Sequence, residues 1–279
     1  MELSHQLQDT QAAFDSVAAN YDGPRGNNAL IQRMRDEVWR TITNTFPPTA
    51  QLLDLGCGTG LDAVYLGQRG YRVIATDWSP LMVERAIDRV RQAQLERFVQ
   101  VDQIGMQEIG QLKIDTPDCG NFDGIYSNFG AINCAPDLSS LAQQCARLLK
   151  PGGKMVFAVI GRICPIEFVH YVCQGKWARA NVRFAQGMVG VNLNKHRVWT
   201  RYYTPREFYR PFAAQFDLLH YRALSLFVPP PYLTGLHDRA KPLFDAAWWL
   251  DDHVGHWPLI REMGDHFLMT LQKGPGVPA

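Results

Sequence analysis

The sequence predicts an α/β protein organised around a doubly wound, mostly parallel sheet. Between residues 50 and 160, short apolar segments with strand character alternate with segments whose apolar residues recur at helical spacing. A glycine-rich turn, residues 56–60, directly follows the first of these strands. Apolar strands that alternate with helices are typical of parallel sheets covered by helices on both faces.

The N-terminal segment is expected to be helical. From residue 10 onward, apolar side chains recur at helical spacing until Tyr21-Asp22-Gly23-Pro24 breaks the pattern. A second helix carries apolar positions from Leu30 to Ile42. Pro47-Pro48 ends this helix, and the chain then enters the first strand.

The remaining elements follow in order along the chain. Pro80, at a first-turn position, opens a helix that reaches about Gln94. Further helices are expected at 138–149, before the turn Pro151-Gly152-Gly153, and at 205–213. The expected strands are 51–55, 72–77, 98–101, 122–127, 154–160, 216–226 and 265–272. Residues 161–204 and 228–262 fit neither pattern and are interpreted as additions that cover the functional edge of the sheet.

The composition argues against several classes of protein. The 279 residues are 46% hydrophobic and 20% charged, as in an ordinary globular enzyme. A net charge of +1 gives no electrostatic reason to expect nucleic acid or an anionic membrane as the main partner. No apolar run reaches membrane-spanning length, and the N-terminus lacks a signal-peptide profile. Six cysteines without C-x-x-C pairing are expected to be reduced thiols, so a cytoplasmic location is expected.

The glycine-rich turn is compatible with two kinds of ligand, a dinucleotide or S-adenosylmethionine. The dinucleotide pattern G-x-G-x-x-G needs a third glycine where this chain has Leu61, because Gly60 stands one position too early. Asp54, two residues before the first glycine, would repel a pyrophosphate and suits a ligand that carries an ammonium group. S-adenosylmethionine carries one, so the turn favours it.

A second carboxylate supports the same ligand. Asp77 ends the second strand, and a carboxylate at this place can accept hydrogen bonds from both ribose hydroxyls. Trp78 and Leu81 beside it can enclose an adenine ring. A carboxylate that merely caps the following helix is the structural alternative for Asp77 taken alone.

Four motifs in order resemble those of the class I S-adenosylmethionine-dependent methyltransferases of the small-molecule type. Leu52–Gly60 resembles motif I, Val73–Ser79 the acidic second motif, Phe122–Ser127 motif IV, and Leu148–Gly153 the turn before strand five. Ala13–Asp22 also resembles the segment that closes over the cofactor. The resemblance implies a seven-stranded sheet of order 3-2-1-4-5-7-6 whose last strand is antiparallel.

The resemblance also implies a division of the chain. Residues 1–48 would form a helical cofactor lid, and residues 49–160 the S-adenosylmethionine-binding core. Residues 161–204 would form a cap, and residues 205–279 the rest of the sheet, with the second insertion at 228–262.

The cofactor contacts implied by the resemblance lie at the ends of the first four strands. Asp54 and the loop would hold the methionine end, Asp77 the ribose, and Ser127 would lie near the sulfonium. Either Asp102 or Gln103 would reach the adenine amino group. The full predicted set is Tyr21, Arg35, Asp54, Gly56, Cys57, Gly58, Gly60, Asp77, Trp78, Asp102, Gln103, Ile104 and Ser127. Tyr21 and Arg35 are candidates for the methionine carboxylate, with an interfacial tyrosine and a solvated arginine as the alternatives.

The acceptor is expected beyond strands four and five. Asn128, Phe129 and Asn133 are the predicted substrate contacts, and Glu167, His170 and Tyr171 the candidate catalytic residues. Methyl transfer is an in-line displacement, so proximity and orientation can supply most of the rate, and a base is needed only if the acceptor must lose a proton. A surface or capping role is the alternative for each histidine.

The sequence therefore predicts an S-adenosylmethionine-dependent methyltransferase (EC 2.1.1) that acts on an oxygen, nitrogen or carbon of a small molecule. The alternatives are an NAD-dependent oxidoreductase and a non-catalytic S-adenosylmethionine-binding protein. No metal site is predicted. A nucleic-acid partner is not expected, because the position after strand four is Ser127-Asn128-Phe129-Gly130 rather than the N-P-P-Y-type tetrad of DNA amino-methyltransferases. The oligomeric state stays open between monomer and homodimer.

Overall fold

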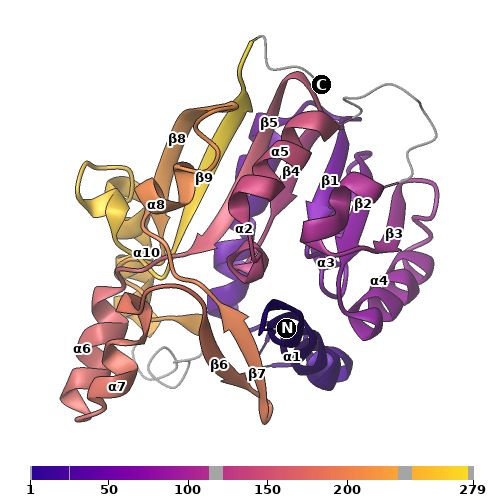
Figure 1. Ribbon diagram of the computed structural model, residues 1–279. Helices are drawn as coiled ribbons and strands as arrows, with labels where there is room; N and C mark the ends of the chain where they lie inside the picture. Colours follow the sequence, from indigo (N-terminus) through magenta and orange to yellow (C-terminus); the bar gives the residue numbers. More distant parts are fainter. Residues whose placement is uncertain (1, 25, 113–121, 232–240, 276–279) are drawn as a thin grey trace.

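A seven-stranded sheet forms the centre of the protein, as Figure 1 shows for the computed structural model. The structure describes residues 2–24, 26–112, 122–231 and 241–275. The strand order is β3-β2-β1-β4-β5-β9-β8. This order confirms the prediction, since β8 and β9 are the sixth and seventh strands of the sheet along the chain.

The strands agree with the expected segments to within a few residues. β1–β5 run parallel, and β9 lies antiparallel between β5 and β8. The antiparallel last strand is thus confirmed. The strands of the sheet are β1 Gln51–Leu55, β2 Arg72–Asp77, β3 Val99–Gln103, β4 Phe122–Ser127, β5 Leu149–Ile160, β8 Phe216–Leu224 and β9 His266–Lys273.

Helices and short 3-10 turns connect the strands. The α-helices are α1 Glu2–Val17, α2 Ala29–Thr45, α3 Leu61–Gly67, α4 Pro80–Gln92, α5 Leu138–Leu148, α6 Pro165–Cys173, α7 Trp177–Ala180, α8 Pro205–Tyr209 and α10 Lys241–Val254. The 3-10 turns are η1 Ala18–Asn20, η2 Met106–Gln111, η3 Ala131–Cys134, η4 Val182–Phe184 and η6 Ile260–Glu262.

Alternation along each strand gives the sheet two apolar faces. In β1, Leu53 and Leu55 belong to the core on one face, and Leu52 belongs to the core on the other. The first core includes side chains of α5 and α8, and the second includes side chains of α2, α3 and α4. The sheet is therefore covered on both sides, which explains why central strands such as β5 and β9 are mostly apolar.

Several element boundaries differ from the sequence-based expectation. α1 begins at Glu2, eight positions before the expected start, because its first turns are polar and carry no apolar stripe to reveal them. β5 spans Leu149–Ile160 and therefore includes Pro151 and Gly152, which were expected to form a turn before the strand. The predicted helix at 205–213 is shorter, since α8 ends at Tyr209.

The first addition contains a hairpin that was not expected. β6 Val189–Leu193 pairs antiparallel with β7 His196–Thr200 outside the main sheet. Its two-residue turn, Asn194-Lys195, has positive φ at both positions, as a tight hairpin turn requires. The second addition contains α10, and its residues 232–240 lie outside the described part of the chain.

Helix α1 packs against this hairpin (Figure 1). The Trp199 amide donates to Thr10 Oγ1 at 3.0 Å, and its indole Nε1 donates to Asp9 Oδ2 at 2.9 Å. Asn194 Nδ2 donates to the Ser16 carbonyl at 3.1 Å. The N-terminal helix and the first addition therefore form one cover at the same end of the sheet.

Two further expectations can be compared with the described residues. Within them, no helix is long and apolar enough to cross a membrane. Cys57, Cys134, Cys145, Cys164 and Cys173 are free thiols, as expected, and Cys119 lies outside the described residues.

Candidate functional site

The glycine-rich turn leaves β1 and immediately contacts β2. The amides of Gly56 and Cys57 both donate to the Thr76 carbonyl, at 2.8 and 2.9 Å. Gly56 has φ +75°, and a Cβ there would lie 2.5 Å from the Ala131 Cβ. Gly60 has φ +77°, and a Cβ would lie 2.9 Å from the Ala86 Cβ in α4. Close packing as well as backbone conformation thus requires glycine at these two positions.

Asp77 closes the turn from the adjacent strand. Its carboxylate accepts the Gly58 amide at 2.8 Å and the Ser79 amide at 2.9 Å. Burial raises the pKa of Asp77, and the two backbone amides oppose the rise. Asp77 is therefore fixed beside the glycine turn, where the sequence analysis placed it, and it also has the structural role considered as its alternative.

Asp54 is an almost fully buried carboxylate beside the turn. The β1–β4 register pairs it with Tyr126, so both side chains lie on the same face of the sheet. Burial raises the pKa of Asp54 well above its usual value, and the Asp62 carboxylate raises it further. The Tyr126 hydroxyl interacts with this carboxylate and lowers its pKa, and neither Asp54 Oδ2 nor the Tyr126 hydroxyl has a further hydrogen-bond partner among the described residues. A buried carboxylate with so little compensation indicates a place where a polar ligand group belongs.

Asp62, in the first turn of α3, is the centre of a buried polar cluster that the sequence analysis missed. Its Oδ1 accepts from Arg35 at 2.5 Å and from the Trp39 indole at 2.8 Å. Its Oδ2 accepts from Asn128 Nδ2 at 2.9 Å. The Arg35 guanidinium also lies 4.6 Å from the ring centroid of Phe129. Arg35 is thus a buried, paired residue rather than a solvated one, and its Nε is without a partner among the described residues.

The segment after α1 lies across the glycine turn. The Tyr21 ring comes within 3.9 Å of the position that a Gly58 Cβ would occupy. Burial raises the pKa of Tyr21 to about 12, with Arg35 lowering it and Asp77 raising it. These interactions place the Tyr21 hydroxyl among the predicted cofactor residues.

A polar latch holds this segment down. Asp22 accepts the Thr59 hydroxyl at 2.6 Å and forms an ion pair with Arg89. Arg89 Nε in turn donates to the Thr59 carbonyl at 2.9 Å. Seven residues earlier, in α1, Asp15 accepts from the Ser79 hydroxyl. The N-terminal segment is therefore attached to the glycine turn and to the start of α4.

The residues predicted for the adenine lie at the ends of β2 and β3. Gln103 pairs with Asp77 in the β2–β3 register, so the two side chains share one face. Asp102 lies on the opposite face and accepts from Gln100 at 2.8 Å. The Trp78 indole Nε1 is buried without a partner among the described residues. Ile104 packs against the core. The choice between Asp102 and Gln103 stays open.

The predicted residues at the end of β4 and after it differ in whether their side chains already have hydrogen-bond partners. Ser127 is buried, and its hydroxyl donates to the Leu55 carbonyl at 2.7 Å. The Asn133 amide bonds the backbone of Ile160 and the Arg201 carbonyl, so it connects β5 to the first addition. Phe129 has a left-handed backbone (φ +46°) and is only partly buried.

The three candidate catalytic residues lie on α6 but point to different surroundings. His170 Nε2 contacts the Gln174 side chain at 2.7 Å on the exposed side, and the Tyr171 ring lies beside it with centroids 5.3 Å apart. Glu167 is buried and forms an ion pair with Arg183. The structure therefore does not bring the three together, and their catalytic role stays a prediction.

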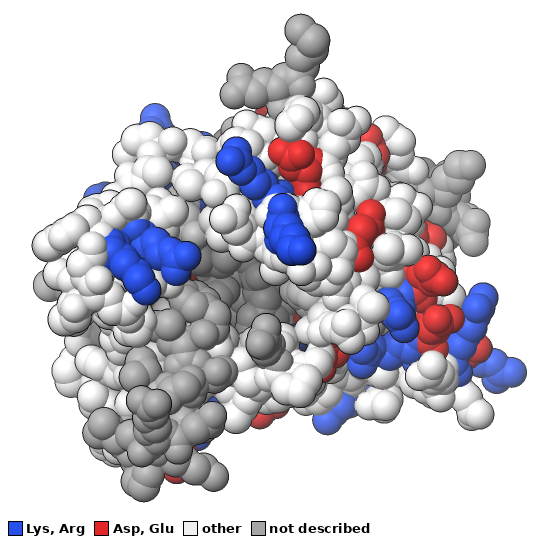
Figure 2. All heavy atoms as spheres, turned by 90° about the horizontal axis from the view of Figure 1, so that it is seen from below, with Lys and Arg blue, Asp and Glu red and all other residues white. Residues whose placement is uncertain are grey.

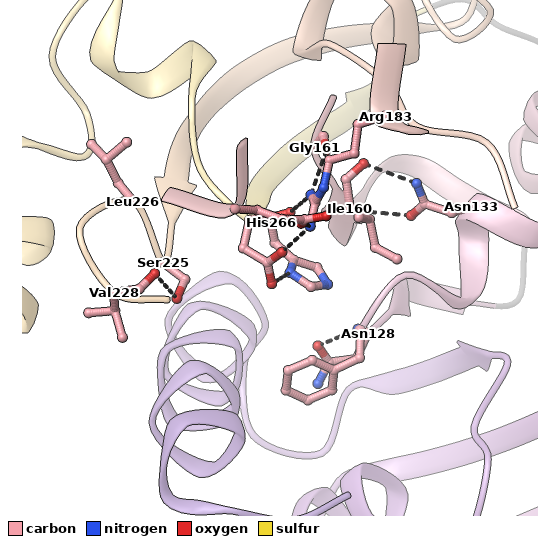
Figure 3. Close-up of polar contacts among 12 residues, drawn as sticks. Asn128, Asn133, Ile160, Gly161, Arg183, Ser225, Leu226, Val228 and His266 are labelled. Carbon is pink, nitrogen blue, oxygen red and sulfur yellow. Dashed lines mark hydrogen bonds and ion pairs between the residues drawn. The ribbon is translucent and has the colours of Figure 1, made fainter. Parts of the chain in front are cut away.

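Arg183, Asp265 and His266 form a second buried network that the sequence analysis did not anticipate (Figure 3). Arg183 NH2 contacts Asp265 Oδ1 at 2.5 Å, and Asp265 Oδ2 accepts from His266 Nδ1 at 2.9 Å. Cys164, Glu167 and Asp265 carry potential ligand atoms within 4.8 Å of one another, but the Arg183 guanidinium supplies the positive charge between the two carboxylates.

A family model and several known proteins are similar to this chain. Residues 53–157 match a methyltransferase domain. A demethylmenaquinone methyltransferase of Clavibacter sepedonicus is 31% identical over 159 residues, covering 56% of this chain and 59% of that protein. A ubiquinone biosynthesis O-methyltransferase of Xanthomonas axonopodis pv. citri is 34% identical over 158 residues, covering 54% and 62%. The match thus spans about 60% of the length of these curated relatives.

Solved structures share the fold over most of the chain. The [4+2]-cyclase SpnF superposes with a TM-score of 0.59 at 18% identity, covering 89% of this chain and 84% of that one. Geranyl diphosphate C-methyltransferase of Streptomyces coelicolor superposes with a TM-score of 0.56 at 17% identity, covering 91% and 86%. Together with the sheet order, the domain match shows a methyltransferase domain in a Rossmann-like methyltransferase fold. The resemblance of the sequence to the class I S-adenosylmethionine-dependent methyltransferases is thereby confirmed.

The residues of this methyltransferase fold fit S-adenosylmethionine. The buried Asp54 carboxylate, with the Tyr126 hydroxyl beside it, suits the ammonium group. Asp77 suits the ribose, and Trp78, the next residue, has a buried indole Nε1 without a partner among the described residues. Asp54, Asp62 and Asp77 together make the turn acidic, which disfavours a pyrophosphate. The geometry thus supports the cofactor choice made from the sequence.

The face that carries α1 and the hairpin shows mixed charge. Figure 2, seen from below, shows lysine and arginine side chains interspersed with aspartate and glutamate around a hollowed middle. The basic side chains are not gathered into one continuous surface on this face. Such a distribution gives little support for a nucleic-acid backbone as the ligand of this methyltransferase fold.

Proposed function

We propose that the chain transfers the methyl group of S-adenosylmethionine to a small-molecule acceptor. The observation that carries the proposal is the fully buried Asp54 carboxylate, with the Tyr126 hydroxyl beside it, next to the glycine turn and Asp77. A buried carboxylate costs free energy unless a partner compensates it, and a bound ammonium group would be such a partner. S-adenosylmethionine supplies a methyl group on a positively charged sulfur, which is lost by in-line displacement.

The residues divide into three groups around the cofactor. Asp54 and the glycine turn would hold the methionine end, with Tyr21 and Arg35 near its carboxylate. Asp77 would hold the ribose. Arg35 is buried and Tyr21 partly buried at this place, and the two interact electrostatically. Most of the rate would come from holding acceptor and methyl in line inside a site from which water is excluded.

We propose further that residues 1–48 act as the cofactor lid and residues 161–204 as the cap. The Asp22–Arg89 latch attaches the lid to the glycine turn. The Trp199 contacts with Asp9 and Thr10 attach the lid to the cap. A lid attached both to the glycine turn and to the cap would close over the cofactor and the acceptor together.

The named relatives suggest the kind of acceptor. Two relatives are named for ubiquinone biosynthesis and for demethylmenaquinone, and a structural neighbour methylates geranyl diphosphate. We propose a small, partly apolar acceptor for this chain as well, methylated on oxygen or carbon. The partly buried Phe129 ring beyond β4 offers apolar contact to it.

Calorimetry tests the proposal against its alternatives. We expect S-adenosylmethionine and S-adenosylhomocysteine to bind with micromolar dissociation constants and NAD not to bind. Methyl transfer from S-adenosylmethionine labelled on its methyl group, assayed with a panel of quinols, catechols, amines and prenyl diphosphates, separates an enzyme from a binding protein. Because one neighbour of this fold is named a cyclase, binding without any methyl transfer would contradict the proposal.

A further inference from the structure

A histidine with one free ring nitrogen lies at the first position of β9. His266 is 7% exposed, and its Nε2 has no hydrogen-bond partner among the described residues. Its Nδ1 lies 2.9 Å from Asp265 Oδ2. Buried polar atoms are nearly always paired, so an unpaired imidazole nitrogen indicates a group that is used when a ligand is present.

The other partners of Asp265 fix the ionisation of this pair. Burial raises the pKa of Asp265, but the charges of His266 and Arg183 outweigh burial and hold it below its ordinary value. An ionised carboxylate has no hydrogen to donate, so the hydrogen of this contact is on Nδ1 of His266. The neutral tautomer of His266 therefore carries its hydrogen on Nδ1 and presents Nε2 as an acceptor.

Arg183 holds the carboxylate in place from the other side. Its NH1 donates to the Gly161 carbonyl at 2.8 Å and to the Asp265 carbonyl at 3.1 Å. Its NH2 reaches Asp265 Oδ1 and also pairs with Glu167. Arg183, Glu167 and Asp265 are each less than a tenth exposed, so the support for the histidine is rigid and dry.

The free nitrogen lies at the edge of the sheet where the acceptor is expected. His266 pairs with Ile160, the last residue of β5, because β9 runs antiparallel and starts at this edge. Its ring centroid is 6.2 Å from that of Phe129, which follows β4. Figure 3 shows the His266 ring between the Arg183 network and the turn that begins at Asn128.

Several titratable and charged groups face this histidine from the elements around it. Asp265 precedes it on its own strand, Arg183 comes from η4, and Glu167 from α6. Arg35 of α2 lies beyond the Phe129 ring, and the Cys164 and Tyr202 side chains interact electrostatically with Arg183 and Asp265. Two cations, Arg183 and Arg35, thus stand against two carboxylates, Asp265 and Glu167. A proton on His266 would add one positive charge directly beside the ionised Asp265 carboxylate.

We propose that His266 is the general base that removes the proton of an acceptor hydroxyl, and that Asp265 and Arg183 are its positioning residues. This inference rests on the proposed methyl transfer. As the acceptor oxygen forms its bond to the methyl carbon, the carbon–sulfur bond breaks and its electron pair stays on sulfur. The hydroxyl proton moves to His266 Nε2, and the resulting imidazolium is stabilised by Asp265.

The need for a base points to a phenolic or enolic hydroxyl. A neutral amine attacks with its free electron pair and can lose its proton afterwards, whereas a hydroxyl becomes a good nucleophile only when its proton leaves. A fixed carboxylate–imidazole pair matches this requirement. The Phe129 ring beside His266 suits an aromatic or conjugated acceptor.

The test compares His266→Gln with His220→Gln, a matched control on β8 whose histidine is exposed and contacts Thr270. The probes are catechol, which ionises with difficulty, and 4-nitrocatechol, which ionises easily. We expect His266→Gln to lower turnover on catechol about 100-fold or more and much less on 4-nitrocatechol, because an ionised acceptor needs no base. His220→Gln should leave both rates unchanged.

A spectroscopic readout is independent of turnover. The absorbance of 4-nitrocatechol reports its ionisation when it is bound to the complex with S-adenosylhomocysteine. We expect bound 4-nitrocatechol to ionise at lower pH in the wild type than in His266→Gln.

The outcomes separate this inference from the proposed function. A wild-type protein that does not bind S-adenosylmethionine would contradict the proposed function. Normal cofactor binding with equal losses on both catechols, or with unchanged ionisation of bound 4-nitrocatechol, would overturn the role of His266. Methylation of amines or carbon but of no phenol or enol, or of none of these probes, would overturn the hydroxyl acceptor.

Discussion

At the scale of single residues, the site separates carboxylates that shape the backbone from those that await a ligand. Asp77 accepts two backbone amides, and Asp62 accepts from three side chains. Asp54, by contrast, has only the Tyr126 hydroxyl beside its buried carboxylate among the described residues. Substitutions of Asp77 and Asp54 should therefore have different consequences for folding and for cofactor binding.

Asp77→Asn should weaken binding of S-adenosylmethionine about 10- to 100-fold, the scale of one or two lost hydrogen bonds to a charged group. Titration calorimetry measures the affinity. Asp123→Asn is the matched control, because Asp123 also accepts a backbone amide, that of Gln51, at 2.8 Å but lies at the other end of the sheet. Equal affinity in wild type and Asp77→Asn would exclude the ribose role.

The raised pKa of Asp54 predicts a pH-dependent stability in the absence of ligand. The folded protein holds the Asp54 proton more tightly than the unfolded chain, so stability is highest below the ordinary aspartate range and falls as pH rises through the raised pKa. Thermal melts of ligand-free Asp54→Asn should show a flatter pH dependence than the wild type. Asp36→Asn, at an exposed position, should follow the wild type. Parallel curves for wild type and Asp54→Asn would contradict the assignment.

The sequence predicted one half of the site better than the other for a physical reason. Asp54 and Asp77 stand next to the glycine turn in sequence, so a local pattern reveals them. Arg183 and Asp265 are 82 positions apart, and only the sheet topology brings them together. His170 follows β5 closely in sequence, yet its helix turns it toward Gln174. Asp62 carried no motif, because its partners Arg35, Trp39 and Asn128 come from two other segments.

At the scale of elements, the sheet was predictable because each strand is a short apolar run between turn residues. The sheet order came from family resemblance and not from the strand patterns themselves. The hairpin β6–β7 was missed because its strands carry few buried residues: β6 alternates between partly buried and exposed positions, and β7 is buried only at Thr200. The two-residue turn Asn194-Lys195 was the available signal.

The attachment of the lid gives a prediction at this scale. Asp22→Asn removes the ion pair with Arg89. The Asp22 side chain is 21% exposed and the Arg89 side chain 34%, so the interaction is partly screened and contributes about 0.5–1 kcal/mol. We expect S-adenosylmethionine to dissociate several-fold faster, with little change in the melting temperature. Stopped-flow displacement by S-adenosylhomocysteine measures the rate.

High salt should weaken the wild-type latch in the same way and reduce the difference between the two proteins. Lys150→Met, which removes the Lys150–Asp123 ion pair at the other end of the sheet, is the control and should dissociate at the wild-type rate. If Asp22→Asn and Lys150→Met behaved alike, the latch would have no role in retaining the cofactor.

At the scale of the whole molecule, Arg183 joins the first addition to the sheet. It comes from η4 and bonds Glu167 of α6 together with Asp265 and Gly161 next to the sheet. Buried charges that lose their only cation are strongly unfavourable. The addition should therefore unfold together with the sheet rather than as an independent unit.

Arg183→Met should destabilise the fold by about 3–5 kcal/mol, since it leaves two carboxylates buried without their cation. Urea unfolding at pH 7 measures the loss. Arg40→Met should cost less than about 1 kcal/mol, because Arg40 is exposed and its partner Glu37 keeps its ion pair with Arg222. Because the pKa of Asp265 is depressed, its contribution is present above the ordinary aspartate range and is lost as pH falls through the depressed value. The wild type should thus lose stability in acid more steeply than Arg183→Met, and an equal acid dependence would refute the network.

The position of β9 has a consequence for how the protein is made on the ribosome. β8 pairs only with β9 in the sheet, and β5 has β9 as its neighbour on that side, although β9 leaves the ribosome after both. Until β9 arrives, the edge of β5 is open and able to pair with other chains. A nascent chain can therefore assemble the glycine turn long before His266 reaches the site. Chains truncated before β9 should bind chaperones or aggregate rather than accumulate as stable, partly folded proteins.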